Sequence, residues 1–429
     1  MSILIKNSRV IDPAHKLDAR RDIYIAKNRI SRIEEKISLR ADTVIDAAGK
    51  ITVPGLVDMH VHLREPGRED KETVASGTAA ALKGGITSML AMPNTTPSID
   101  SPRSVVLLRE IIEQTAGARV FICGAITRGR RGKQLVDIAS LKKNGIIAVS
   151  DDGSSVDSEA LFLKALKAAK KNKIPVVSHC ENSLLSAGGV VNLGLLSTRL
   201  GLRGISRESE YSRVERDIGL AARAKCPVHI AHVSCKESVE IIARSKKKGI
   251  AVTAETAPHY FALTEEAVGD YDTNKKMNPP LRCGADAEAI KQGLREGVID
   301  VIASDHAPHT ENEKAVEFDR AEFGVIGLET ELAVSITVLV RPGMLTWSEC
   351  VRKLTINPAR ILGISGGTLG VGRPADLAII DPDKEWVVGK EGFISKSKNS
   401  AFLGARLRGT VEYTICRGGI VYKDSKWNL

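Results

Sequence analysis

Histidine and aspartate residues close several short apolar runs of this sequence, and both types are common ligands of divalent metal ions. His60 and His62 are two residues apart, a spacing that places both imidazoles on one face of a strand. Further runs end at Asp152, His179, His232 and Asp305. This mixture of nitrogen and oxygen ligands is sufficient for two divalent ions and favours Zn²⁺ over Mn²⁺ or Co²⁺.

Two ions about 3.5–4 Å apart can share a hydroxide, which is a nucleophile at neutral pH. His60 and His62 alone are weak support for this chemistry, because short histidine pairs also occur as ordinary half-buried side chains. The complete set of six residues is far more specific, and it predicts a metal-dependent hydrolase.

The residues between 55 and 365 must position these ligands. Short apolar runs recur there at Leu56–His62, Ile86–Met92, Val120–Ala125, Ile146–Ser150, Pro175–His179, Val228–Val233, Ala251–Glu255 and Val301–Ser304. Stretches with helical periodicity, such as Glu208–Ala224, separate most of them. Eight strands alternating with helices predict an α/β (β/α)8 barrel of the TIM type, whose active site lies where the strands end. A doubly wound open sheet is the alternative, but no G-x-G-x-x-G motif follows the first strand.

Residues 1–54 and 366–429 contain short strand-like runs separated by glycine, proline and polar residues. Each end is too short for a core of its own. We therefore expect one small composite β-sandwich domain formed by both chain ends, beside a barrel domain at 55–365. The polar stretch Thr310–Arg320 after the last barrel strand is expected to be a loop that could act as a lid.

The composition is that of an ordinary globular protein, with 43% hydrophobic and 27% charged residues among 429. The net charge of +10 suggests nucleic-acid binding, but only 4% of the residues are aromatic, which argues against base stacking. The seven cysteines form no CxxC pair, and no signal peptide or membrane-spanning segment is apparent. We expect a cytoplasmic protein with no nucleic-acid or membrane partner.

Several long motifs resemble the amidohydrolase superfamily and, within it, the bacterial class I dihydroorotases. They are VPGLVDMHVHLREPG (Val53–Gly67), MPNTTP (Met92–Pro97), SDDG (Ser150–Gly153), SDHAPH (Ser304–His309) and GRPADL (Gly372–Leu377). The resemblance covers essentially the whole chain. It implies reversible hydrolysis of (S)-dihydroorotate to N-carbamoyl-L-aspartate, a step of de novo pyrimidine synthesis.

The resemblance also implies two zinc ions bridged by a carboxylate and a hydroxide. It assigns His60 and His62 to one ion, His179 and His232 to the other, Asp152 to the bridge, and Asp305 to the first ion and to the general base that later acts as acid. Asp152 is preferred to Asp151 because Asp151 points to the other face of an ideal strand.

Arg64 lies on the strand face of His60 and His62, where a guanidinium could bind a substrate carboxylate bidentately. A surface salt bridge is the alternative. The resemblance adds further substrate contacts at Asn94, Asn278, His309, Phe323 and Gly324. Asn94 could instead serve a turn, and His309 could cap a loop.

Three other functions fit parts of the pattern. Allantoinases typically have asparagine where this chain has Arg64, and hydantoinases usually carry a bridging lysine where it has Asp152. An inactive scaffold for aspartate transcarbamoylase would have lost metal ligands, and this chain keeps all six. Aspartate transcarbamoylase remains an expected partner, as does a second copy of the chain in a homo-oligomer.

Overall fold

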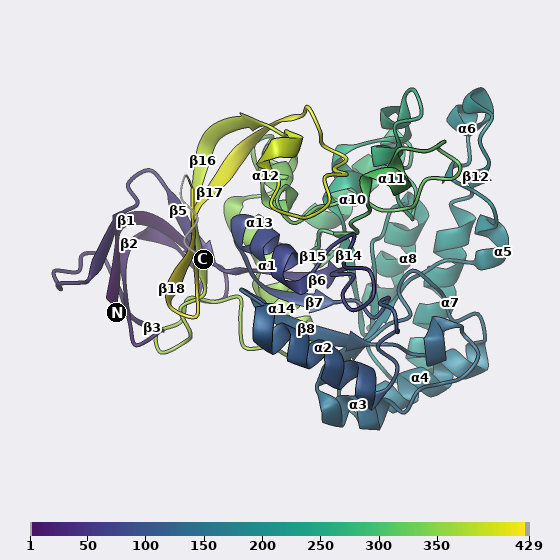
Figure 1. Cartoon of the computed structure of the whole chain (residues 1–429), viewed down its shortest axis with the longest axis horizontal. Helices are drawn as coiled ribbons and strands as arrows, with labels where there is room; N and C mark the ends of the chain where they lie inside the picture. Colours follow the sequence, from purple (N-terminus) through teal and green to yellow (C-terminus); the bar gives the residue numbers. More distant parts are fainter. Residues whose placement is uncertain (1, 425–429) are drawn as a thin grey trace.

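The computed structural model describes residues 2–424 and contains a barrel of eight parallel strands (Figure 1). They are β6 (Leu56–Val61), β7 (Ile86–Ala91), β8 (Arg119–Gly124), β9 (Ile146–Val149), β10 (Val176–Ser178), β13 (Val228–Ile230), β14 (Val252–Thr256) and β15 (Val301–Ile302). The strands follow one another in chain order around the sheet. A bridge between Val61 and His306 brings the first and last strands together. The expected (β/α)8 barrel is confirmed.

Helices follow the strands and cover the outside of the barrel (Figure 1). The longer ones are α1 (Val74–Lys83), α2 (Pro102–Thr115), α3 (Ile138–Asn144), α4 (Glu159–Lys171), α7 (Glu208–Ala224), α8 (Lys236–Lys247), α10 (Gly284–Arg295), α13 (Trp347–Leu354) and α14 (Ile356–Leu362). Short elements are α5 (Ser183–Ser186), α6 (Leu195–Leu200), α9 (Pro258–Ala262), α11 (Glu311–Lys314), α12 (Glu331–Ser335) and the strand pair β11 (Val191–Asn192) and β12 (Gly204–Ile205). Thr73 and Ser101 cap α1 and α2 through side-chain hydrogen bonds to the first turn, which explains where these helices begin.

Barrel strands are apolar on both faces because each face packs against a different layer. Side chains of five strands meet in one buried cluster that fills the barrel interior, namely Leu90, Cys123, Ala148, Val177 and Val301. Their sequence neighbours, such as Met89 and Ile122, belong to the larger core that includes the helices. The polar residues that end the strands are therefore held on a rigid scaffold.

The two chain ends pair in a second, mixed sheet of eight strands. These are β1 (Ser2–Asp12), β2 (Leu17–Ala26), β3 (Arg29–Glu34), β4 (Thr43–Asp46), β5 (Ile51–Pro54), β16 (Leu377–Val387), β17 (Arg406–Cys416) and β18 (Gly419–Lys423). Antiparallel pairing of β5 with β16 joins the two ends, as the purple and yellow strands of Figure 1 show. Ile3, Ile23, Ile379 and Ile415 from both ends lie in one buried cluster. The composite β unit is confirmed, and the exact domain limits stay a prediction.

A segment between β16 and β17, residues 388–405, leaves this sheet and reaches the barrel; we call it the crossing segment. Ser400 forms a bridge with Ile326, and the Ser397 hydroxyl donates to the carbonyl of Lys71. The Asn399 side chain accepts from the backbone N–H of His309 and donates to the carbonyl of Gly324. The sequence did not predict this contact between a chain end and the loops beyond the barrel strands.

Candidate metal centre and active site

Two histidines and two aspartates form one compact group at the strand ends. His60 Nε2 lies 3.2 Å from Asp152 Oδ1 and 3.7 Å from Asp305 Oδ1. His62 Nε2 lies 3.4 Å from Asp152 Oδ2 and 3.4 Å from Asp305 Oδ1. All four side chains are buried, and His60, His62 and Asp305 can converge on one metal ion.

The other two predicted histidines meet the same Asp152 carboxylate. His179 Nδ1 and His232 Nε2 are each 3.4 Å from Asp152 Oδ1 and 2.8 Å from each other. His60, Asp152 and His232 form a second set able to hold a metal ion. Asp152 therefore stands between the two histidine pairs, the place that a bridging carboxylate requires.

Two atoms of this group show that the residues suit a cation. His60 Nε2 and Asp152 Oδ1 are buried and have no hydrogen-bonding partner among the residues that the structure describes. Leaving such atoms unsatisfied is costly, and a metal ion would satisfy both. In addition, His232 and Asp305 adopt positive φ angles of 34° and 47°, a strained backbone that in non-glycine residues is concentrated at functional sites.

Electrostatics hold the carboxylates ionised. Burial opposes the charge on Asp152, but His60 and its neighbouring histidines outweigh it and hold the pKa of Asp152 well below its usual value. Burial likewise opposes the charge on Asp305, while His62 and His60 lower its pKa. Ionised carboxylates are the form that binds metal ions.

Asp151 has a different environment from Asp152. Its carboxylate accepts hydrogen bonds from the backbone N–H groups of Ile126 (2.8 Å) and Thr127 (2.9 Å) and from the Thr127 hydroxyl. Asp151 thus connects β9 to the loop after β8 and has little capacity left for a metal ion.

Three acceptor side chains orient the histidines by hydrogen-bonding the ring nitrogen that would not face a metal ion. Glu255 Oε1 lies 2.5 Å from His60 Nδ1, Glu181 Oε2 lies 3.1 Å from His179 Nε2, and Asn94 Oδ1 lies 2.7 Å from His62 Nδ1. Each acceptor fixes the proton on one ring nitrogen and frees the other for a metal ion. Asn94 therefore lies in the site, held against His62.

Sequence reasoning missed Glu181 and Glu255. Glu255 ends the run Ala251–Glu255, and a charged residue at a strand end was the available signal. Two further histidines, His229 and His259, lie nearby. His229 is hydrogen-bonded to Thr253 and Glu255, and burial lowers the pKa of His259 to about 4.

Arg64 brings a half-buried positive charge to the same site. Its guanidinium donates to the Pro308 carbonyl (3.1 Å) and lies 3.3 Å from His309 Nε2, and it forms no ion pair within residues 2–424. Burial lowers the pKa of Arg64 to about 10, against the opposing effect of Asp305 and Asp152. A half-buried guanidinium without an ion pair is suited to an incoming carboxylate.

The remaining predicted substrate contacts surround Arg64 and the histidines. Asn278 donates to Glu181 Oε2 (3.1 Å), and His309 is hydrogen-bonded to the Phe323 carbonyl (2.8 Å). The Gly324 N–H donates to the carbonyl of Lys276, so it is already engaged. Gly324 has a φ of 127°, and a Cβ there would lie 2.7 Å from the Cβ of Ala307, so only glycine fits beside His309.

A (β/α)8 barrel with this set of histidines and aspartates at its strand ends defines a hydrolase of the amidohydrolase class. Two family models match the chain, "Dihydro-orotase-like" over residues 49–238 and "Amidohydrolase family" over residues 209–422. Relatives named Dihydroorotase include those of Elusimicrobium minutum (51% identity; 97% of each chain covered), Acetivibrio thermocellus (46%; 98% of this chain and 99% of the relative) and Pelotomaculum thermopropionicum (47%; 99% of each). The chain belongs to the dihydroorotase family.

Solved structures support the fold independently. L-hydantoinase (dihydropyrimidinase) from Arthrobacter aurescens superposes with a TM-score of 0.90 at 24% identity, covering 100% of this chain and 97% of its own. D-hydantoinase from Thermus sp. gives 0.85 at 22% identity, covering 99% and 96%. At these identities the likeness concerns the fold alone. Within residues 2–424, no helix has the length and apolar character needed to cross a membrane.

Proposed function

We propose that the chain is a zinc-dependent dihydroorotase, which hydrolyses (S)-dihydroorotate reversibly to N-carbamoyl-L-aspartate in pyrimidine synthesis. The observation that carries the substrate assignment is the half-buried guanidinium of Arg64, which lies beside the metal centre and forms no ion pair within residues 2–424. Dihydroorotate offers a ring carboxylate for this group, whereas hydantoin and allantoin have none. The dihydroorotase relatives, similar over nearly the full chain, support the same assignment.

Two zinc ions fit the donor set described above. His60, His62 and Asp305 would hold one ion, His179 and His232 the other, and the Asp152 carboxylate would serve both. The unpartnered atoms His60 Nε2 and Asp152 Oδ1 support this assignment. When bound, such ions supply Lewis acidity and lower the pKa of water.

The residues of the chain would complete the chemistry. Arg64 binds the carboxylate of dihydroorotate and so fixes the position of the ring amide. The Asp305 carboxylate takes the proton of the attacking water as the new C–O bond forms, and it returns that proton to the amide nitrogen as the C–N bond breaks. The His62 ring, held by Asn94, keeps Asp305 in place.

An assay of purified, metal-loaded protein with dihydroorotate, allantoin and hydantoin side by side tests the activity. We expect turnover of dihydroorotate and about two equivalents of zinc per chain. Turnover of allantoin or hydantoin alone would assign a different cyclic-amide hydrolase. Absence of bound zinc in protein purified without chelator would revive the scaffold alternative.

The resemblance further supports a cytoplasmic homo-oligomer that associates with aspartate transcarbamoylase. Light scattering of the protein alone and mixed with that enzyme tests both associations. A monomeric mass for the protein alone would contradict the homo-oligomer, and an unchanged mass of the transcarbamoylase in the mixture would contradict the association with it.

A further inference from the structure

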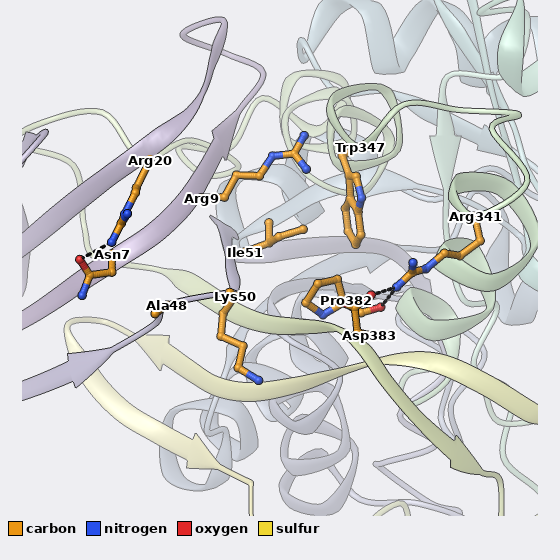
Figure 2. A pocket seen from close by; sticks show the side chains of 11 residues that line it. Asn7, Arg9, Arg20, Ala48, Lys50, Ile51, Arg341, Trp347, Pro382 and Asp383 are labelled. Carbon is orange, nitrogen blue, oxygen red and sulfur yellow. Dashed lines mark hydrogen bonds and ion pairs between the residues drawn. The ribbon is translucent and has the colours of Figure 1, made fainter.

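Two cavities outside the metal centre are lined by basic residues, and they differ in how those charges are paired. The first, of about 500 Å³, lies between the chain-end sheet and the start of α13 (Figure 2). Its cations are Arg9, Arg20, Lys50 and Arg341. Arg9 pairs with Asp18, Lys50 with both Asp381 and Glu412, and Arg341 with Asp383. Arg20 forms no ion pair within residues 2–424. Its charges are largely neutralised, so this cavity gives little attraction for an anion.

The second cavity, of about 430 Å³, lies between the crossing segment and the loop around α11. Three of its lysines contact carbonyl oxygens only. Lys398 Nζ donates to the carbonyls of Phe393 (2.6 Å) and Ser395 (2.7 Å), and Lys396 Nζ donates to the carbonyl of Glu69. Lys314 Nζ, which is buried, donates to three carbonyls, including that of Gly324 at 3.0 Å.

Carbonyl oxygens hold an ammonium group in place without cancelling its charge. The acids that line the same cavity, Asp70 and Glu311, are paired with Arg68 and Lys390. No carboxylate of residues 2–424 forms an ion pair with Lys314, Lys396 or Lys398. A partly enclosed space with surplus positive charge attracts anions more strongly than an open surface does.

The cavity adjoins the active site through His309. This residue lines the cavity, and its Nε2 lies 3.3 Å from Arg64 Nη2. Asn399, also in the lining, is hydrogen-bonded to the backbone of His309 and of Gly324. A molecule bound in the cavity would therefore contact residues that position the proposed substrate-binding end of the active site.

We propose that this cavity is a second binding site for a small oxyanion, a carboxylate or a phosphate, held by Lys396 and Lys398. The site is separate from the metal centre and does not depend on the substrate that the metal centre hydrolyses. Lysine supplies point charges without the planar fork of arginine, and both kinds of oxyanion accept them. The side chains of Asn274 and Thr310 give the lining further polar groups.

Calorimetric titration of the metal-loaded protein at low ionic strength tests the site, with inorganic phosphate and succinate as separate probes. We expect an equivalent of anion whose affinity falls at least tenfold in the double variant Lys396→Gln/Lys398→Gln. Lys384→Gln is the matched control, because it removes the same charge from an exposed lysine on the chain-end sheet that pairs with Asp424.

Tighter binding of phosphate would indicate a phosphorylated ligand, and tighter binding of succinate a carboxylate ligand. Identical titrations of the wild type, the double variant and the control would overturn the proposal, as would failure of the wild type to bind either probe outside the metal centre. The single variant Lys396→Gln, at an exposed position, should show a smaller loss of affinity and covers the case in which the double variant folds poorly. Turnover of dihydroorotate, measured on the same proteins, tests the proposed function separately.

Discussion

Glu255 lies between two histidines, with Oε1 2.5 Å from His60 Nδ1 and Oε2 3.1 Å from His229 Nε2. Burial opposes the charge on Glu255, but His60 and His229 outweigh it and lower its pKa. The carboxylate therefore remains an acceptor. It holds the proton of His60 on Nδ1 and leaves Nε2, which faces Asp152, free for a metal ion.

Glu255→Gln should weaken metal binding. The amide keeps the shape of the side chain but loses the negative charge that orients His60, and loss of such a partner typically costs about 10–100-fold in metal affinity. Competition with a chelator of known affinity measures the change. Glu240→Gln, at an exposed acid on α8 that lies near Lys236, should bind zinc like the wild type. Equal affinities in both variants would contradict the orienting role of Glu255.

Adjacent aspartates should give opposite phenotypes. Asp152→Ala should lose bound zinc, since among residues 2–424 only the Asp152 carboxylate contacts both histidine pairs. Asp151→Ala should retain the ligands but lower the free energy of unfolding, because it leaves buried donors of Ile126 and Thr127 without a partner, at roughly 1–3 kcal/mol each. Metal analysis and urea unfolding of the two variants distinguish them. Loss of zinc from the Asp151 variant with retention in the Asp152 variant would reverse the assignment.

Asp305→Ala should remove turnover with little effect on folding. A positioned general acid–base contributes about 10²–10⁴-fold to rate, and loss of a metal-binding oxygen adds to the defect. Steady-state assays combined with thermal unfolding measure both properties. Activity like that of the wild type would exclude Asp305 as the proton carrier.

Arg64→Ala should impair substrates that carry a carboxylate. Hydrogen bonds to charged groups contribute about 1.5–3 kcal/mol, so we expect kcat/KM for dihydroorotate to fall roughly 10²-fold. The ring analogue without the carboxylate, dihydrouracil, should be turned over no worse by the variant than by the wild type. An equal loss on both substrates would show that Arg64 serves the structure of the site and not the carboxylate.

Lys353 should make the stability of the fold depend on pH. Its side chain is buried, with Nζ 2.7 Å from the carbonyl of Ile299, and burial lowers its pKa to about 8. Between pH 8 and the unfolded value of about 10.4 the unfolded chain binds more protons than the folded one, so the stability contributed here rises with pH. Urea unfolding at pH 7.5 and 9.5 should show a gain on the order of 2 kcal/mol that Lys353→Met lacks. An identical pH dependence in both proteins would exclude Lys353 as its source.

The sequence predicted the barrel because its strands are buried on both faces and read as continuous apolar runs. Each of the eight predicted runs overlaps a barrel strand to within one residue at the strand's start or end, even where, as in β15, only Val301 and Ile302 are paired. The residues expected to bind metal converge because the carboxyl ends of parallel strands share one rim of a barrel. Residue type and strand parity were therefore sufficient to predict the barrel and the set of residues that meets at its rim.

Glu255 and the crossing segment depend on contacts that no local pattern encodes. Glu255 meets His60 across 195 positions of sequence, and the spacing of a single glutamate does not indicate its partner. The centre of the crossing segment, residues 395–400, is a polar stretch of serine, lysine and asparagine, typical of a solvated loop. Asn399 reaches His309 because the crossing segment, which joins β16 to β17, packs against the loops beyond the barrel strands.

Because the crossing segment lies near the C-terminal end, the substrate-binding part of the site can be completed only late in the synthesis of each chain. Every proposed metal ligand precedes residue 306, but Ser395 is hydrogen-bonded to Glu72 across 323 positions, and Asn399 supports the loop that carries His309. A nascent chain whose barrel has already left the ribosome would still lack these supports until residue 400 emerges. A stop codon shortly before Ser395 would therefore produce chains with a complete ligand set and an unsupported substrate pocket.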